Sequence, residues 1–155
     1  MVLVTGAGRR VGSAIALACG GAGAEVAIHF RSSRDGADRT AAAVRELGRS
    51  GETFQCDISA PREARRLIDD VIARFGAIDV LVNSAAVFAR HAFADGDDAA
   101  WEKAWRTSID TNLLAPARLG LQEIGVECPA EPGPRPVQQH SLVGLGDLER
   151  VTDLL

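Results

Sequence analysis

The chain has 155 residues, of which 46% are hydrophobic and 25% are charged, and its formal net charge is -4 at pH 7. These values fit one globular domain of about 100–200 residues and argue against general nucleic-acid binding. No apolar run approaches the ~20 residues of a membrane span, and the start, MVLVTGAGRR, lacks a secretory-signal pattern.

The three cysteines, Cys19, Cys56 and Cys128, are scattered along the chain without the spacing of metal ligands. An odd, scattered set is typical of reduced thiols in the cytosol rather than of a disulfide framework. We therefore expect a cytoplasmic protein with no metal site and no membrane partner.

The first two-thirds of the chain alternates short apolar runs with longer helical patterns. The apolar runs predict strands at residues 2–5, 25–30, 53–56 and 80–83, and the segments between them predict helices at 10–19, 36–47 and 61–75. This alternation is typical of parallel strands joined by crossover helices. We expect an α/β fold with a Rossmann-type, doubly wound parallel sheet, incomplete at about four strands.

Helix 61–75 has the clearest periodicity. Its apolar residues recur at spacings of three and four, which predicts one face against the sheet. These residues are Ala64, Leu67, Ile68, Val71, Ile72 and Phe75. Ser59 is a candidate N-cap, and Pro61 suits the first turn because its missing N–H is not needed there.

A fourth helix is predicted at residues 99–119, where Trp101, Trp105, Ile109 and Leu113 are spaced four apart. After Leu121 the composition changes, and the stretch CPAEPGPRPVQQH holds four of the six prolines. Proline at this density is excluded from central strands and helix interiors. We predict a domain over residues 1–121 and an irregular tail over 122–155, whose leucine spacing permits a short C-terminal helix.

The stretch TGAGRRVG joins the first strand to the first helix and contains Gly6, Gly8 and Gly12. A glycine-rich turn at this place lets the backbone approach a pyrophosphate, and the helix N-terminus supplies N–H donors. The match to G-x-G-x-x-G fails at Val11, and a tight turn without a ligand explains the same residues. The turn alone therefore leaves both interpretations open.

The second strand ends in HFRSS, where an NAD-binding fold places an acidic residue against the ribose. Here Arg31, with Ser32 or Ser33, offers a guanidinium and hydroxyl groups that suit a 2′-phosphate. Arg9 and Arg10 can lie near the same phosphate. These residues favour NADP(H), and the alternative is that the arginines are ordinary solvated surface residues.

Taken together, TGAGRRVG, HFRSS, CDIS, LVNSAA and WRTSIDTNLLAP resemble the short-chain dehydrogenase/reductase family over residues 1–121. Arginine at position 10 in place of a turn glycine, followed by His-x-Arg-Ser, is similar to the pteridine reductase branch. The resemblance implies that residues 1–121 bind NADP(H). It implies contacts from Gly6, Arg10 and Gly12 to the phosphates, Arg31 and Ser32 to the 2′-phosphate, Asp57 to the adenine amino group, and Asn83 and Ala85 to the cofactor after the fourth strand.

The catalytic residues of the family match less well. Asn112 corresponds to the helix asparagine that supports a proton-relay water in the family, and its alternative role is helix capping. The family also uses a tyrosine with a lysine four residues on. This sequence has no tyrosine and its one lysine is Lys103. The "NNAG" of the family stands here as NSAA.

These observations leave several functions open. The first is the NADP(H)-binding portion of a reductase that transfers hydride to a carbonyl or pteridine, inactive on its own. The second is a non-catalytic module that pairs with an intact reductase, as a homo- or hetero-oligomer, through the exposed side of the fourth strand. A third is a truncated or frame-shifted product, and a fourth is an enzyme with an unfamiliar acid at Asp110 or Ser141.

Overall fold

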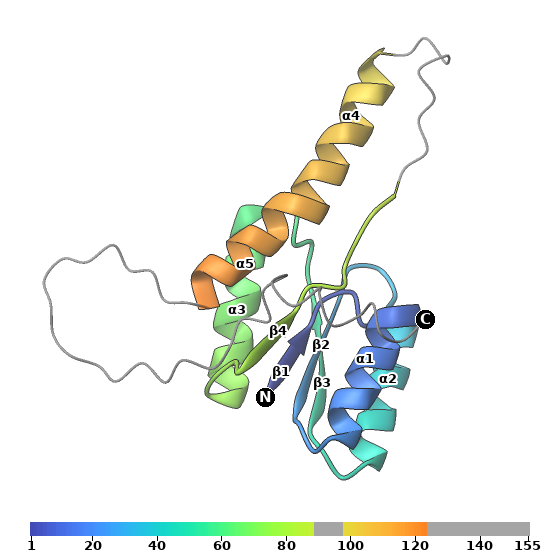
Figure 1. The fold of residues 1–155 in the computed structure, drawn as a ribbon, viewed down its shortest axis with the longest axis vertical. Helices are drawn as coiled ribbons and strands as arrows, with labels where there is room; N and C mark the ends of the chain where they lie inside the picture. The colour runs from blue at the N-terminus through green and yellow to red at the C-terminus, as the bar shows by residue number, and fades with distance from the viewer. Residues whose placement is uncertain (89–97, 124–155) are drawn as a thin grey trace, which may run out of the picture.

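The computed structural model describes residues 1–88 and 98–123 (Figure 1). Its sheet consists of β1 (Val2–Val4), β2 (Val26–Phe30), β3 (Gly51–Gln55) and β4 (Val80–Val82), all parallel, in the order β3-β2-β1-β4. The helical segments are α1 (Arg10–Gly21), α2 (Arg34–Glu46), α3 (Pro61–Phe75), α4 (Asp98–Ile109), the π-helical turn η2 (Asp110–Leu114) and α5 (Ala115–Glu123). The predicted Rossmann-like α/β fold is confirmed. The predicted tail helix, Cys128 and Ser141 lie outside the described residues.

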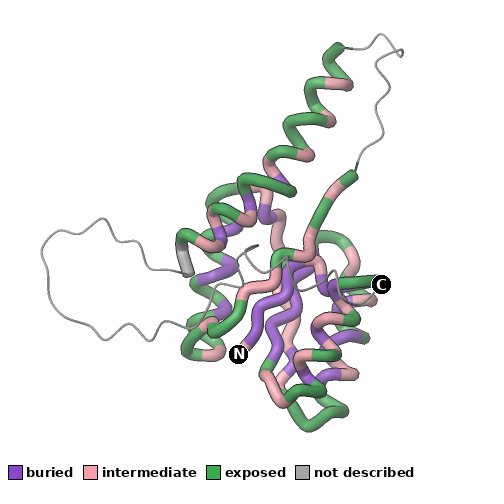
Figure 2. Tube along the Cα trace, viewed as in Figure 1, coloured by how far each residue is buried: buried purple, intermediate pink, exposed green. Residues whose placement is uncertain are grey.

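The sheet is covered on both faces, which explains why its central strands are uninterrupted apolar runs. Val2 and Val4 of β1 point to the layer formed by α1 and α2, whereas Leu3 points to the layer formed by α3 and α5. The alternation follows from the period of two along a strand. Figure 2 shows the buried residues concentrated in β1 and β2, between these two helical layers.

Helix α3 confirms most of its predicted apolar face and corrects one member of it. Ala64, Leu67, Ile68 and Val71 are buried, but Ile72 is 40% exposed. One residue is a rotation of about 100° around a helix, so Ile72 is turned away from the sheet that Val71 faces. Apolar residues spaced four apart can therefore include a residue such as Ile72 that lies beside the buried face of the helix.

The predicted cap of α3 is wrong. Ala60 is the N-cap residue and makes no side-chain hydrogen bond, while the Ser59 hydroxyl donates to Asp57 Oδ1 at 2.7 Å. The hydroxyl acts here as a donor to a carboxylate, instead of accepting from the N–H groups at the start of the helix as an N-cap would. Ser59 therefore belongs to the Asp57 loop rather than to the helix.

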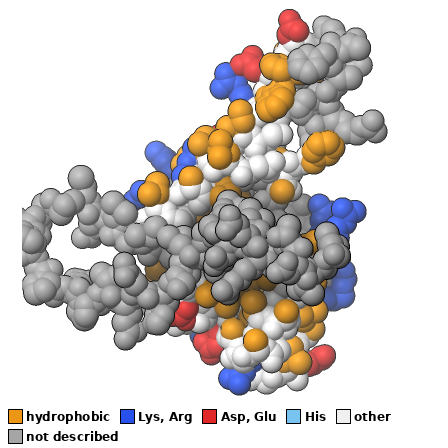
Figure 3. All heavy atoms as spheres, viewed as in Figure 1, with side chains coloured by type: hydrophobic (Ala, Val, Ile, Leu, Met, Phe, Trp, Pro, Cys, Tyr) orange, Lys and Arg blue, Asp and Glu red, His pale blue; other side chains and the backbone are white. Residues whose placement is uncertain are grey.

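The helix predicted at residues 99–119 is present, but its α-helical register is interrupted by η2, which separates α4 from α5. A π-helical turn holds more residues than an α-helical turn, so the apolar residues on either side of it do not share a face. Thr111, Ala115 and Leu119 are buried, whereas Trp105 and Ile109 are 44% and 42% exposed. Helix α4 extends away from the sheet in Figure 1, and Figure 3 shows hydrophobic side chains gathered along it.

Within residues 1–88 and 98–123, β4 pairs only with β1 and forms one edge of the sheet. Val80 is 48% exposed, and Leu81 and Val82 are half-buried. The sequence predicted an exposed sheet edge at the fourth strand, and β4 forms such an edge in this part of the chain. None of the helices in this part of the chain is long and apolar enough to cross a membrane.

Candidate functional site

A pocket of about 310 Å³ opens at the carboxyl ends of the parallel strands. It is lined by the β1–α1 turn, the end of β2, the loop after β3, the segment after β4 and Thr111 of η2. The chain runs from β1 to β2 and β3 on one side, and then places β4 on the other side of β1. The carboxyl ends of strands at such a switch point are where open α/β sheets bind ligands.

Two glycines of the first turn are required by the backbone. Gly6 has a φ of 67°, and a Cβ on it would lie 2.7 Å from the Ala85 Cα. A Cβ on Gly12 would lie 2.5 Å from the carbonyl oxygen of Gly6. Both approaches are too close for any side chain, so the turn is packed tightly between β4 and the start of α1.

The N-terminus of α1 is open to an anion. Arg9 is its N-cap residue with φ -168° and ψ 164°, it makes no side-chain cap hydrogen bond, and the first turn contains no acidic residue. The first N–H groups of a helix have no intrahelical acceptor, so an anion at the pocket can satisfy them. Arg9 and Arg10 add positive charge at the same end. This geometry fits a dinucleotide pyrophosphate.

His29 fixes the turn from the side of β2. The backbone N–H of Gly6 donates to His29 Nδ1 at 3.2 Å, so Nδ1 is the unprotonated nitrogen and Nε2–H donates to the Cys56 carbonyl at 3.2 Å. Burial lowers the pKa of His29, although the hydrogen bond to Cys56 and the charge of Asp57 act to raise it. His29 is therefore a neutral cross-link between the first turn and the residue after β3.

Thr5 fixes the turn from the side of β4. Its hydroxyl donates to the Val82 carbonyl at 3.2 Å and accepts from the backbone N–H groups of Ser84 at 3.0 Å and Ala85 at 3.1 Å. The first turn, the end of β2 and the segment after β4 are therefore held together by side chains as well as by the sheet. Thr5 was not predicted from the sequence, and its position directly before Gly6 was the available signal.

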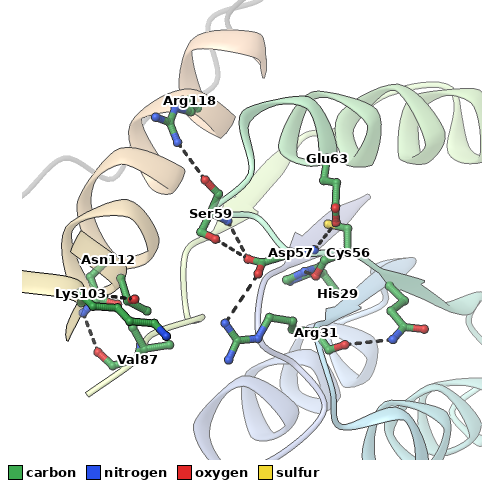
Figure 4. A network of polar contacts seen from close by, with 12 residues as sticks. His29, Arg31, Cys56, Asp57, Ser59, Glu63, Val87, Lys103, Asn112 and Arg118 are labelled. Atoms are coloured by element: carbon green, nitrogen blue, oxygen red, sulfur yellow. Dashed lines mark hydrogen bonds and ion pairs between the residues drawn. The ribbon is translucent and has the colours of Figure 1, made fainter. Parts of the chain in front are cut away.

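Asp57 and Arg31 come together at one end of the pocket, as Figure 4 shows. Asp57 Oδ1 accepts from the Ser59 hydroxyl and from the Ser59 N–H, the latter at 3.0 Å, and Asp57 Oδ2 lies 3.8 Å from Arg31 Nη1. Burial acts to raise the pKa of Asp57, but the two hydrogen bonds from Ser59 and the charges of Arg31 and His29 outweigh it and lower the pKa. Asp57 is therefore an ionised hydrogen-bond acceptor beside a guanidinium.

The pocket gathers most of the residues expected to bind the cofactor. Those that line it are Gly6, Arg10, Gly12, Arg31, Ser32, Asp57 and Ala85. Asn83 is exposed and is not among the lining residues, so its contact with a cofactor stays a prediction. Thr111 and Ile58 line the pocket without having been expected there. Thr111 directly precedes Asn112 in DTNLLAP, and that was the one signal for it.

Asn112 lies in η2 and contacts the segment that follows β4. Its Oδ1 accepts from the Val87 N–H at 2.9 Å and its Nδ2 donates to the Val87 carbonyl at 2.8 Å (Figure 4). The two bonds join η2 to the chain after β4. Asn112 is not among the residues that line the pocket. Its expected part in proton relay stays a prediction, while its observed contacts join two segments.

The described residues give no support to a metal or thiol centre. No group of three or more His, Cys, Asp or Glu side chains within residues 1–88 and 98–123 is placed to hold a metal ion. Burial, followed by the charges of Glu63 and Asp57, raises the pKa of Cys56 to about 12. A thiol with that pKa is protonated near neutral pH and is a poor nucleophile.

The fold is a Rossmann-like α/β fold with a pocket at the switch point of its sheet. The model of the short-chain dehydrogenase family matches residues 1–121, and the chain belongs to that family. It is 35% identical over 122 residues to the 3-oxoacyl-(acyl-carrier-protein) reductase FabG of Aggregatibacter actinomycetemcomitans, which covers 77% of this chain and 50% of that protein.

Two solved structures from Burkholderia cenocepacia are also similar. A short-chain dehydrogenase in complex with NADP has a TM-score of 0.73 and 30% identity, over 79% of this chain and 49% of that one. A dehydrogenase with bound NADP has a TM-score of 0.68 and 32% identity, over 76% of this chain and 44% of that one. The chain thus spans half or less of the length of the relatives that it matches.

Proposed function

We propose that residues 1–121 bind NADP(H) as the cofactor-binding portion of a short-chain reductase. The observation that carries this proposal is the guanidinium of Arg31 in the pocket, at the strand end where NAD-binding folds have a carboxylate. An acid at this place accepts hydrogen bonds from the ribose and repels a 2′-phosphate, whereas a guanidinium attracts the phosphate. The NADP bound in the two similar structures supports the same cofactor.

In this proposal each side of the pocket holds one part of the cofactor. The first-turn N–H groups of α1 and the charge of Arg10 bind the pyrophosphate, and Arg31 with Ser32 binds the 2′-phosphate. Asp57 accepts from the adenine amino group, and Ala85 lies against the cofactor after β4. When bound, the cofactor supplies a hydride. The preference for NADP over NAD thus depends on positive charge at two neighbouring loops.

We further propose that these 155 residues alone do not complete the reaction. Transfer of a hydride to a carbonyl produces an alkoxide, which needs a proton donor of suitable pKa. The family supplies it from a tyrosine, and this sequence contains none. Asn112 is the one recognisable member of the catalytic set. A carbonyl or a pteridine remains the proposed substrate class of the whole reductase, and the pteridine reductase branch is favoured by Arg10 and by HFRSS.

The cofactor proposal is tested by calorimetric titration of the chain with NADPH and NADH. We expect tighter binding of NADPH, and we expect Arg31→Ala to weaken NADPH about tenfold or more, the cost of a charge-assisted hydrogen bond, with little change for NADH. Arg62→Ala, which removes an exposed arginine of α3 outside the pocket, is the matched control. Equal affinity of the folded wild-type chain for both nucleotides, or no binding of either, would refute the proposal.

A second candidate is a cytoplasmic module that associates with another chain through β4. It is favoured by the exposed edge of β4, where Val80 is 48% exposed. An unpaired strand edge presents N–H and C=O groups that another chain can pair with. Size-exclusion chromatography with light scattering tests this second candidate. A dimer, or a stable complex with an intact reductase, supports it. A monomer that does not bind the reductase argues against it.

A further inference from the structure

Gln55, the last residue of β3, contacts the loop that carries Arg31. Its side-chain Nε2 donates to the Arg31 carbonyl at 3.0 Å, and its Oε1 accepts from Arg34 Nη2. The Arg34 guanidinium also lies 5.2 Å from the centre of the Phe30 ring. Both ends of the Gln55 amide are therefore engaged, and its orientation is set by one acceptor and one donor.

The side chain of Arg31 is held more weakly than its backbone. Its ion pair with Asp57 is 3.8 Å long, and the two side chains are 51% and 40% exposed. Exposed ion pairs of this kind contribute little. Arg31 and Ser32 are both exposed on the loop between β2 and α2. The hydrogen bond from Gln55 is thus a side-chain contact to the backbone of Arg31, from which the Arg31 side chain extends.

Arg34 is engaged away from the pocket. Its guanidinium is occupied by Gln55 and by the face of Phe30, and Arg34 is not among the residues that line the pocket. The loop after β2 and the first residue of α2 therefore carry two arginines with different contacts. Arg31 faces the pocket, and Arg34 holds the Gln55 amide in the orientation that leaves its NH₂ group toward the Arg31 carbonyl.

We propose that Gln55 is a positioning residue for nucleotide specificity: it fixes Arg31 where the guanidinium meets a 2′-phosphate. This inference rests on the proposed function, because it assumes that the pocket binds NADP(H). A guanidinium binds phosphate strongly only when its donors are aligned with the oxygens. A shift of the loop weakens that alignment, whereas the pyrophosphate turn is held separately, by His29 and Thr5.

The test compares NADPH with NADH on the 155-residue chain by calorimetry. Gln55→Met keeps the length of the side chain and removes both hydrogen bonds. We expect it to raise the Kd for NADPH about five- to tenfold, as the loss of one aligned hydrogen bond does, and to change the Kd for NADH less than about twofold. The control is Glu52→Gln on the same strand, which removes the ion pair with Arg74 at the far end of β3 and leaves the ratio of the two constants unchanged.

Gln55→Glu gives an independent variant, because it keeps the acceptor for Arg34 and cannot donate to the Arg31 carbonyl. It is expected to lose discrimination at least as strongly as Gln55→Met. An unchanged ratio in either folded variant overturns the inference, and so does an equal loss for both nucleotides, which is what a merely structural role would produce. The proposed function fails separately, if the wild-type chain itself does not prefer NADPH.

Discussion

Replacing Arg10 by glycine is expected to raise stability and lower NADPH affinity at the same time. Arg10 has a φ of 51°, and it is the one non-glycine residue with positive φ within residues 1–88 and 98–123. A side chain in this left-handed region costs about 1–2 kcal/mol. Glycine removes that cost, but it loses about 0.5–1 kcal/mol more backbone entropy on folding. The net gain in the free energy of unfolding is about 0.5–1 kcal/mol.

The effect on affinity has the opposite sign. If Arg10 contributes one charge-assisted hydrogen bond to the phosphates, its loss costs about 1.5–3 kcal/mol, or a factor of at least about ten in the Kd for NADPH. Arg10→Ala separates the two effects, because it removes the guanidinium and keeps a Cβ at the strained position. Both variants should lose affinity alike, and only Arg10→Gly should gain stability.

Urea denaturation followed by circular dichroism measures the stability, and calorimetry measures the affinity. A gain of about 0.5–1 kcal/mol corresponds to a shift in Tm of only a few degrees for a domain of this size, so denaturant curves on all three proteins are preferable to single melting points. The reasoning fails if Arg10→Gly is less stable than Arg10→Ala, or if both variants bind NADPH as the wild-type chain does.

Three further outcomes follow from the contacts in the pocket and the core. Burial lowers the pKa of His29 below 6.5, so the unfolded chain takes up a proton that the folded chain does not, and stability falls as the pH is lowered from about 6.5 toward the folded-state pKa. Denaturation curves from pH 8 to 5 should show this fall, and His29→Gln should reduce it. The Thr111 hydroxyl is buried and has no hydrogen-bond partner within the described chain, so Thr111→Val should raise the free energy of unfolding by about 1 kcal/mol. Thr107→Val, which removes a hydroxyl that donates to the Lys103 carbonyl at 2.9 Å, should not; an equal effect of the two substitutions would contradict the argument. With a pKa of about 12, Cys56 should react with iodoacetamide at pH 8 far more slowly in the folded chain than in urea, as peptide mass spectrometry can measure.

The sequence predicted the sheet because its signals are local. The VLV run of β1 and the spacing of Leu67, Ile68 and Val71 report burial directly, and the structure places them in the core. The break at η2 was not predictable in this way. Residues 110–114 contain no glycine or proline that would signal a break, and the π turn is accompanied by contacts between Asn112 and Val87, which are 25 residues apart.

The residues of the site also fall into two groups, those with a local sequence signal and those without one. Gly6, Gly12 and Arg31 were identified because a turn glycine and a charge at a strand end are recognisable by position alone. The residues that hold them were not: Gln55 acts on a loop 24 residues away, and Thr5 acts on a segment about 80 residues away. A side chain whose partner is set by the register of the sheet carries no local signal, and its role is visible only once the strands are paired.

Several contacts that shape the pocket join the ends of β1, β2 and β3 to the segment after β4. His29 joins the first turn to the end of β3, and Thr5 joins it to the segment after β4. Asp57 and Arg31 meet at the ends of β3 and β2. A pocket closed by these local links does not need further strands in order to exist. Under the proposed function, binding of NADPH and reduction of a carbonyl should therefore be separable: we expect the first to be measurable on these 155 residues and the second to be absent, because the sequence contains no tyrosine.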